Sequence, residues 1–149
     1  MILAVGLTPA WQQILLFGSF RPGQVNRAQQ AHWCASGKVI NVGMAIHRLG
    51  TPVRTLSLVG GDAGQSIRDE LAQAKIDACW IETSTSTRIC TTILDQATNQ
   101  TTELVENSNE PPDEDIDSFV SAYRQQVVSA DVVVLSGSLP AGVSPAFYA

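Results

Sequence analysis

The sequence predicts an open, mostly parallel α/β sheet, and three observations support this fold class. Apolar segments of strand length alternate with segments of helical periodicity along most of the 149 residues. Residues 132–135 form a continuous apolar run, which is typical of a parallel strand covered on both faces. Glycine-containing turns at 35–37 and 60–61 lead directly into two of the helical segments.

Three more strands are expected on the same reasoning. Residues 1–7 are apolar and stop at Thr8-Pro9, so they are expected to form a buried first strand. Residues 53–59 and 78–82 are short apolar runs of the same kind, and the first of them ends at Gly60-Gly61.

Three helices are expected between these strands. Residues 40–49 are apolar on most sides, and Gly50 is a C-terminal stop signal. Residues 62–75 place apolar side chains on one face, namely those of Ile67, Leu71 and Ala74. Residues 113–128 follow Pro111-Pro112, carry acids in the first turn and repeat apolar side chains at helical spacing.

Two stretches interrupt this alternation of strand and helix. Residues 13–34 contain two extended segments around Arg21-Pro22-Gly23. Residues 88–106 alternate in polarity around a turn at 97–100 and so predict a hairpin. Both stretches suit a small second sheet that stands off the main one. The alternative is that they are edge strands of the main sheet.

The end of the sequence predicts the start of another helix. Ser144 and Pro145 are a favourable pair for the N-cap and first turn, and few residues follow them. We therefore expect residues 1–149 to be the N-terminal part of one α/β domain that continues in a longer protein.

Composition excludes several classes of partner. The net charge of −5 argues against nonspecific binding to nucleic acid or anionic membranes, and half of the 14 acidic residues lie between Glu103 and Asp117. No apolar run has the length of a membrane span, and the N-terminus has no basic leader. The cysteines lack disulfide or zinc spacing and indicate free thiols in a reducing cytoplasm; they are Cys34, Cys79 and Cys90.

The most informative segment is Ala35–Val42, which places Lys38 in a small-residue turn directly before a helix. The first turn of a helix presents unpaired N–H groups and the positive end of its dipole, and the lysine adds a full charge. This combination suits a phosphate or another anion. The alternative is an ordinary helix N-terminus with a solvated lysine.

Other polar residues are candidates for the same site. Ser136-Gly137-Ser138 follows a buried strand, and ligands of open α/β sheets collect at the carboxyl ends of the strands. Thr8-Pro9-Ala10 and the turn before Lys38 are candidates for the same edge, although such small residues are equally good turn formers. Arg88, at the start of a strand, is either a bidentate clamp for an anion or a surface charge.

The segment Gly60–Gly64 also follows a strand and opens a helix, as in dinucleotide-binding turns. However, Leu58 stands where the first glycine of that fingerprint is needed. The simpler interpretation is a tight turn that allows strand and helix to approach closely. The sequence contains no metal-binding motif and no Ser–His–Asp order that would support hydrolysis.

A set of short motifs extends from end to end of the chain. They are MILAVGLTPA at 1–10, Val25-Asn26-Arg27, ASGKVINVGMAIHRLG at 35–50, LVGGDAGQ at 58–65, Thr87-Arg88 and SGSLPAGV at 136–143. In this order and spacing they resemble the N-terminal part of the PfkB/ribokinase family of sugar kinases. The resemblance is strongest to the branch of 1-phosphofructokinase and tagatose-6-phosphate kinase.

The resemblance implies a Rossmann-like (ribokinase-like) α/β fold with a small β lid over the sugar, formed by about 13–34 and 88–106. Members of the family transfer the γ-phosphate of ATP, with Mg²⁺, to a hydroxyl of a sugar or sugar phosphate. The residues that would meet the phosphate of the sugar, carried over by position, are Arg27, Lys38, Arg88 and Ser138. By the same resemblance Gly37 and Asn41 would line the sugar pocket, and the lid would support a homodimer.

Three departures from the family pattern bear on function. The early motif Asn-Pro-x-x-Asp ends here in Gln12, so an uncharged amide replaces an aspartate that accepts hydrogen bonds from sugar hydroxyls. Ser36 and Val39 stand where the family prefers glycine, and Val39 is expected to narrow the site. The second family signature, Gly-Ala-Gly-Asp with the catalytic aspartate, is absent, as are the strands that bind ATP.

Two hypotheses follow. The first is that the chain is the N-terminal part of an ATP-dependent kinase for a sugar phosphate of the fructose 1-phosphate or tagatose 6-phosphate class. Its catalytic base is then expected beyond Ala149, and the fragment alone would bind neither ATP nor Mg²⁺ and be inactive. The second is a non-catalytic module for sugar-phosphate binding or dimerisation.

Overall fold

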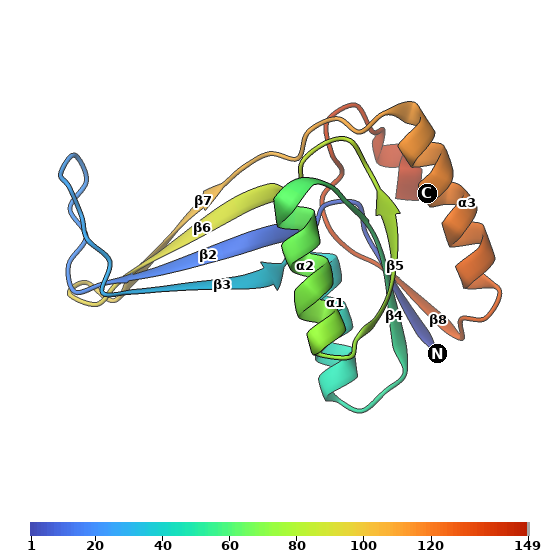
Figure 1. Cartoon of the computed structure of the whole chain (residues 1–149), viewed down its shortest axis with the longest axis horizontal. Coiled ribbons are helices and arrows are strands. Elements are labelled where there is room, and N and C mark those ends of the chain that lie inside the picture. Colours follow the sequence, from blue (N-terminus) through green and yellow to red (C-terminus); the bar gives the residue numbers. More distant parts are fainter. Residues whose placement is uncertain (149) are drawn as a thin grey trace.

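The computed structural model describes residues 1–148 and contains two sheets whose strands run in different directions (Figure 1). Sheet A has four strands in the order β5-β4-β1-β8, and all its neighbouring strands are parallel. Its strands are β1 (Ile2–Val5), β4 (Val53–Val59), β5 (Asp77–Glu82) and β8 (Val132–Leu135). This arrangement confirms the predicted open parallel α/β sheet.

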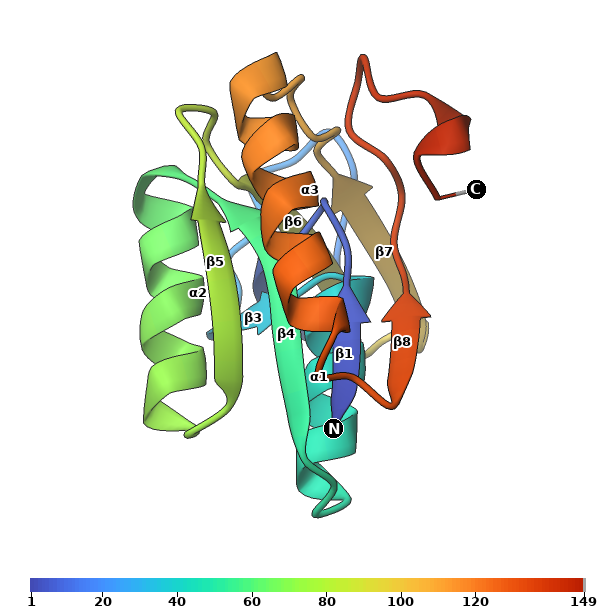
Figure 2. The same ribbon diagram turned by 90° about the vertical axis from the view of Figure 1, so that its right-hand side faces the viewer.

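Helices cover both faces of sheet A. Helices α1 (Lys38–Arg48) and α2 (Gly61–Gln73) lie on one face (Figure 1). Helix α3 (Asp113–Val127) lies on the other face, in front of the strands in Figure 2. All three helices are found close to their predicted bounds. None of the helices in residues 1–148 is long and apolar enough to span a bilayer.

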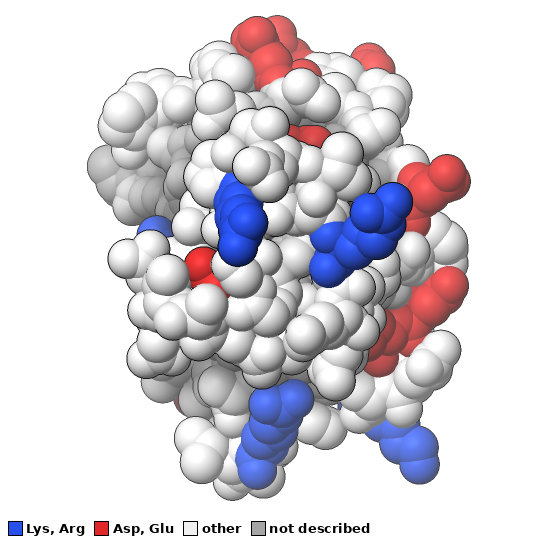
Figure 3. All heavy atoms as spheres, turned by 90° about the vertical axis from the view of Figure 1, so that its left-hand side faces the viewer, with Lys and Arg blue, Asp and Glu red and all other residues white. Residues whose placement is uncertain are grey.

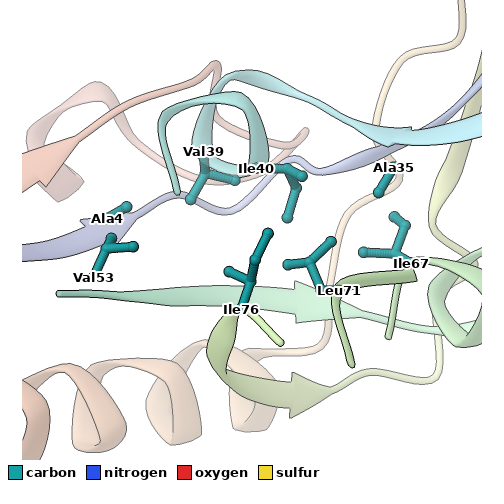
Figure 4. Close-up of a cluster of buried hydrophobic side chains, with 8 residues drawn as sticks. All are labelled: Ala4, Ala35, Val39, Ile40, Val53, Ile67, Leu71 and Ile76. Atoms are coloured by element: carbon teal, nitrogen blue, oxygen red, sulfur yellow. The ribbon is translucent and has the colours of Figure 1, made fainter. Parts of the chain in front are cut away.

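The two faces of sheet A have separate cores, because neighbouring residues of a strand point to opposite sides. In β1, Ala4 joins the cluster beneath α1 and α2, whereas Leu3 and Val5 join the cluster beneath α3. Figure 4 shows the first cluster, whose members are Ala4, Ala35, Val39, Ile40, Val53, Ile67, Leu71 and Ile76. In the second cluster Phe119 of α3 is fully enclosed.

Helix α1 packs closely on β4 because residue 43 is glycine. A Cβ atom at Gly43 would lie 2.2 Å from Oγ1 of Thr55. Thr55 is completely buried, and its hydroxyl has no hydrogen-bond partner among residues 1–148. The helix is therefore held at this point by close packing and not by a hydrogen bond.

Sheet B extends away from sheet A (Figure 1) and has the strand order β3-β2-β6-β7. Its strands are β2 (Ala10–Phe17), β3 (Gln30–Ser36), β6 (Arg88–Asp95) and β7 (Gln100–Val105). Strand β2 is antiparallel to β3 and parallel to β6, and β6 is antiparallel to β7. The two interrupting stretches thus form a sheet of their own, and the alternative that they are edge strands of the main sheet is wrong.

One face of sheet B rests on α2 near the junction with sheet A. Trp11 and Ala35 are register partners on this face and pack in the same cluster as Ile67 and Leu71 of α2. Trp33 lies on the same face and stacks on Trp11, with ring centroids 6.1 Å apart. We call this side of the sheet, which carries Trp11, Trp33 and Ala35, the α2 face.

Helix α2 also holds the edge of sheet B through a hydrogen bond. The backbone N–H of Ala35 donates to Oε2 of Glu70 over 2.6 Å. Burial and the nearby charge of Glu70 raise the pKa of the Cys34 thiol above its usual value, so this thiol is protonated at neutral pH. All three cysteines are free, as predicted.

The predicted start of a helix at Ser144 is present, but the turn that follows is a 3₁₀ helix, Pro145–Tyr148. The Ser144 carbonyl accepts a 2.9 Å hydrogen bond from the N–H of Phe147, and its hydroxyl accepts one of 3.2 Å from Ala146. Ala149 lies outside the described residues.

Replacing Gly43 with alanine should lower the free energy of unfolding by about 1–3 kcal/mol, because the new methyl group overlaps the buried Thr55 hydroxyl. Thr55→Ala removes that hydroxyl and leaves Cβ of residue 55 at 3.5 Å from the new methyl group. The double variant should therefore lose less than the sum of the two single variants. Urea denaturation of the four proteins measures this coupling, and strict additivity would contradict the role given to Gly43.

Candidate functional site

Thr8 joins two loops at the carboxyl edge of sheet A. It follows β1 and is buried. Its Oγ1 atom donates to the carbonyl oxygen of Ser138 over 3.0 Å and lies 3.1 Å from the Ser138 hydroxyl. Ser138 follows β8 and is exposed. The expectation that residues 8–10 and 136–138 share one edge of the sheet is therefore confirmed.

The turn before α1 reaches the same place because residue 37 is glycine. Gly37 has φ of 96°, a conformation that L-residues with side chains rarely adopt. A Cβ atom there would lie 2.9 Å from Cα of Pro9 and 3.0 Å from the carbonyl oxygen of Thr8. Any larger residue would push the turn and the Thr8-Pro9 loop apart, so Gly37 sets the distance between α1 and this loop.

Lys38 and Asn41 lie at the exposed start of α1. Lys38 is the first helical residue, and Asn41 follows one turn later on the same side of the helix. The N–H of Asn41 already donates to the carbonyl of Gly37 over 2.9 Å. The ion pairs of residues 1–148 do not involve Lys38; they join Met1 to Asp131, Arg54 to Asp77 and Arg68 to Glu82. The Lys38 amine is therefore available to an anion.

Arg88 is the first residue of β6, and its guanidinium lies at the junction of the two sheets. It donates to three backbone carbonyls: Nε to Pro9 over 3.4 Å, Nη2 to Thr8 over 3.3 Å and Nη1 to Glu106 over 3.2 Å. These bonds are long, their acceptors carry no net charge, and a guanidinium has five N–H donors. Arg88 is thus more than a solvated surface charge, and it keeps donors for an additional partner.

Arg27 is not part of this cluster. It lies in the loop between β2 and β3, the blue loop at the far end of sheet B in Figure 1. The whole length of β2 separates this loop from Thr8, which corresponds to roughly 25 Å. Asn26 closes the loop by accepting from the N–H of Arg21 over 2.8 Å and donating to its carbonyl over 2.7 Å. Within one chain the β2–β3 hairpin carries Arg27 away from Lys38, so the structure of the single chain does not bring Arg27 together with the other residues expected to meet the phosphate.

Gln12 lies on β2, and its side chain is already hydrogen-bonded within sheet B. Its Nε2 donates to Oγ1 of Thr92 over 2.7 Å. The β2–β6 register places Gln12, Arg88 and Thr92 on one side of the sheet, opposite to the α2 face. We call this side the Arg88 face. Thr92 could not be found from local sequence pattern, because its partner Gln12 lies eighty positions earlier in the chain.

Val39 does not narrow the site, contrary to the expectation from sequence. Its side chain is 1% exposed and belongs to the core beneath α1 and α2. Gly6 of the first loop packs directly on it, since a Cβ atom at Gly6 would lie 2.8 Å from Cβ of Val39. Because helix α1 begins at Lys38, residue 39 lies on the side of the helix that faces the core.

The glycine turn at 60–61 has a packing explanation. A Cβ atom at Gly60 would lie 2.2 Å from the carbonyl of Thr85 and 2.4 Å from that of Thr83. The N–H of Gly60 donates to Oγ1 of Thr87 over 3.0 Å. The loop 83–87 therefore occupies the space at the start of α2, which supports the tight-turn interpretation over dinucleotide binding.

The cations on the side of the molecule that carries the tip of sheet B are dispersed. Figure 3 shows lysine and arginine side chains separated from one another by uncharged atoms on this side. The described residues seen there thus form no continuous basic patch.

Comparison with known proteins places the chain in a family. A family model described as pfkB family carbohydrate kinase matches residues 1–149. A Thermotoga maritima protein described as a possible 1-phosphofructokinase is 28% identical with a TM-score of 0.89, over 97% of this chain and 47% of that one. Escherichia coli phosphofructokinase-2, solved with fructose-6-phosphate, has a TM-score of 0.80 over 97% of this chain and 48% of its own. It is 24% identical to this chain, and at that level of identity the likeness shows the fold alone.

The chain thus spans about half the length of these solved relatives. Its parallel sheet A, the helices on both faces and the separate sheet B are found again in the ribokinase-like fold of these structures. Because the family model matches from the first residue to the last, the chain belongs to the pfkB family of carbohydrate kinases.

Proposed function

We propose that this chain forms the sugar-phosphate-binding part of an ATP-dependent kinase. The substrate of that kinase is of the fructose 1-phosphate or tagatose 6-phosphate class. The observation that supports this most is the meeting of three segments around Thr8 and Pro9. The start of α1 with Lys38, the hydroxyl of Ser138 and the guanidinium of Arg88 all lie at this meeting point.

The chemistry of these groups suits an ester phosphate. A phosphate accepts hydrogen bonds from amines, hydroxyls and backbone N–H groups, and the N-terminal end of a helix adds a favourable dipole. In phosphoryl transfer the protein mainly positions the reactants and neutralises charge. A sugar held by its own phosphate at Lys38 and Ser138 would present its hydroxyls to the space beside sheet B, with Gly37 and Asn41 next to it.

We propose that residues 1–148 do not themselves hold ATP or Mg²⁺. They contain no group of three or more histidine, cysteine or acidic side chains placed to hold a metal ion. Glu106, whose carbonyl accepts from Arg88, has another partner for its carboxylate, which accepts a 2.8 Å hydrogen bond from the N–H of Ile89. We assign ATP, Mg²⁺ and the general base of the complete kinase to residues outside this chain.

A second candidate, a module for dimerisation, is favoured by the α2 face of sheet B. Three large apolar side chains on this face stay exposed in the single chain: Trp33 by 40%, Ile89 by 36% and Leu104 by 55%. Apolar groups gathered on one face of a sheet are typical of an interface. We propose that a second copy of the chain covers them, a role that is compatible with kinase activity of the complete protein.

Lys38→Gln should weaken binding of fructose 1-phosphate or tagatose 6-phosphate by about tenfold or more, because a charged donor to the phosphate is lost. Isothermal titration calorimetry on the 149-residue chain measures the change. The control is Lys75→Gln, which removes the only other lysine, in the turn after α2. Equal affinity of wild type and Lys38→Gln would exclude the anion role of Lys38.

The isolated chain should not transfer phosphate. In a coupled assay with ATP, Mg²⁺ and either sugar phosphate, ADP should form no faster than in the same mixture without sugar. Sugar-dependent release of ADP that disappears in Lys38→Gln would show that the base and the ATP site lie within these residues.

Leu104→Glu should shift the chain from dimer to monomer, because the interface would have to bury a charge. Light scattering after gel filtration reads the mass. Val105→Glu is the matched control, because Val105 is 56% exposed and lies on the opposite face of the same strand. A monomeric wild type, or equal effects of both substitutions, would remove the α2 face as the interface.

A further inference from the structure

The Arg88 face of sheet B is the side that turns toward the site. Arg88 donates to the carbonyl of Thr8, and the hydroxyl of the same threonine donates to the carbonyl of Ser138. The α2 face, by contrast, rests on α2 near its base. Side chains on the Arg88 face are therefore the ones that can contact a ligand held at Lys38 and Ser138.

The strand register divides this face into rows. Ser36, Ala10 and Arg88 form the first row, next to the junction with sheet A. The second row holds Cys34, Gln12, Cys90 and Val105. Consecutive rows on one face of a sheet lie about 7 Å apart. Arg88 is the only charged side chain in these two rows, and the Gln12 amide is the strongest hydrogen-bonding group in the second.

The Gln12 side chain has a defined orientation because one end of it is bonded. Its Nε2 donates to Thr92 Oγ1 over 2.7 Å, and Thr92 is only 9% exposed. Within residues 1–148 this is the single hydrogen bond of the Gln12 amide. Since the nitrogen end of the amide faces Thr92, the oxygen end faces away from it and stays free to accept.

We infer that Thr92 is a positioning residue that fixes Gln12 so that its Oε1 accepts a hydrogen bond from a hydroxyl of the bound sugar. The inference rests on the proposed function and adds a selection rule to it. A ligand must carry a phosphate for the first row and a hydroxyl about 7 Å away for the second, a separation found across a five- or six-carbon sugar phosphate. The acceptor is an amide, so this recognition does not titrate with pH as a carboxylate would.

Thr92→Val tests the inference, because valine keeps the shape of the side chain and removes the acceptor. Affinity for fructose 1-phosphate or tagatose 6-phosphate, whichever binds, should fall about three- to tenfold. Affinity for inorganic phosphate should not change, since phosphate alone does not reach Gln12. Thr92→Ser keeps the hydroxyl and should restore the affinity for the sugar phosphate.

The same strand offers a matched control. Thr91 lies on the α2 face, and its hydroxyl donates to Oε1 of Gln13 over 3.4 Å. Thr91→Val therefore removes an equivalent threonine–glutamine contact from the side that faces away from the site. It should leave the binding of sugar phosphate and of inorganic phosphate unchanged, and similar unfolding midpoints of the two valine variants would show that both fold.

A measurement without ligand separates this inference from the proposed function. The ¹⁵N heteronuclear NOE of the Gln12 side-chain amide should report an ordered group in wild type and Thr92→Ser, and a mobile one in Thr92→Val. An equally ordered amide in Thr92→Val would overturn the positioning role whatever the ligand does.

The binding outcomes are equally distinct. If wild type binds a sugar phosphate and Thr92→Val binds it equally well, the inference is wrong and the proposed function stands. If Thr92→Val weakens the binding of inorganic phosphate as much as that of the sugar phosphate, the substitution affects the whole site and the inference is also wrong. If wild type binds neither sugar phosphate, the proposed function fails together with the selection rule, and the amide NOE alone decides whether Thr92 positions Gln12.

Discussion

The close contact of three backbone segments around Thr8 and Pro9 is the constraint on which the rest of the site depends. The absence of a side chain at Gly37 lets the start of α1 approach this loop, and the Thr8 hydroxyl joins it to Ser138. Arg88 completes the contact from sheet B through the Thr8 and Pro9 carbonyls. The first loop of the chain thus sets the positions of both cations relative to the hydroxyl, although none of its own residues carries a charge.

Much of the fold could be predicted from local pattern, because short apolar runs mark the strands of sheet A and a helical spacing of apolar residues marks the helices that cover it. The segments 53–59 and 132–135 were predicted with the bounds that the structure shows. The meeting of residues 8–10 with 136–138 also followed, since the carboxyl ends of parallel strands share an edge. Val39 was misjudged because the helix begins two residues earlier than expected, and this changes which side chains point inward.

The site could be predicted only in part, because its remaining geometry is set by contacts between distant segments. The position of Arg27 depends on the direction in which the β2–β3 hairpin leaves the junction, which no local pattern encodes. The bond between Gln12 and Thr92 depends on the parallel register of β2 and β6, whose residues are eighty positions apart. Gln12 was noted as a departure from the family, but its partner becomes visible only when the strands are paired.

Helix α2 is shared by the two sheets, and this has a mechanical consequence. Ile67 and Leu71 pack in one cluster with Val53 of sheet A and with Ala35 and Trp11 of sheet B. Tilting one sheet against the other would break this common apolar contact and the Glu70–Ala35 hydrogen bond together. The angle at the junction is therefore more firmly held on the side of α2 than on the opposite side, where Arg88 makes only long hydrogen bonds to backbone carbonyls.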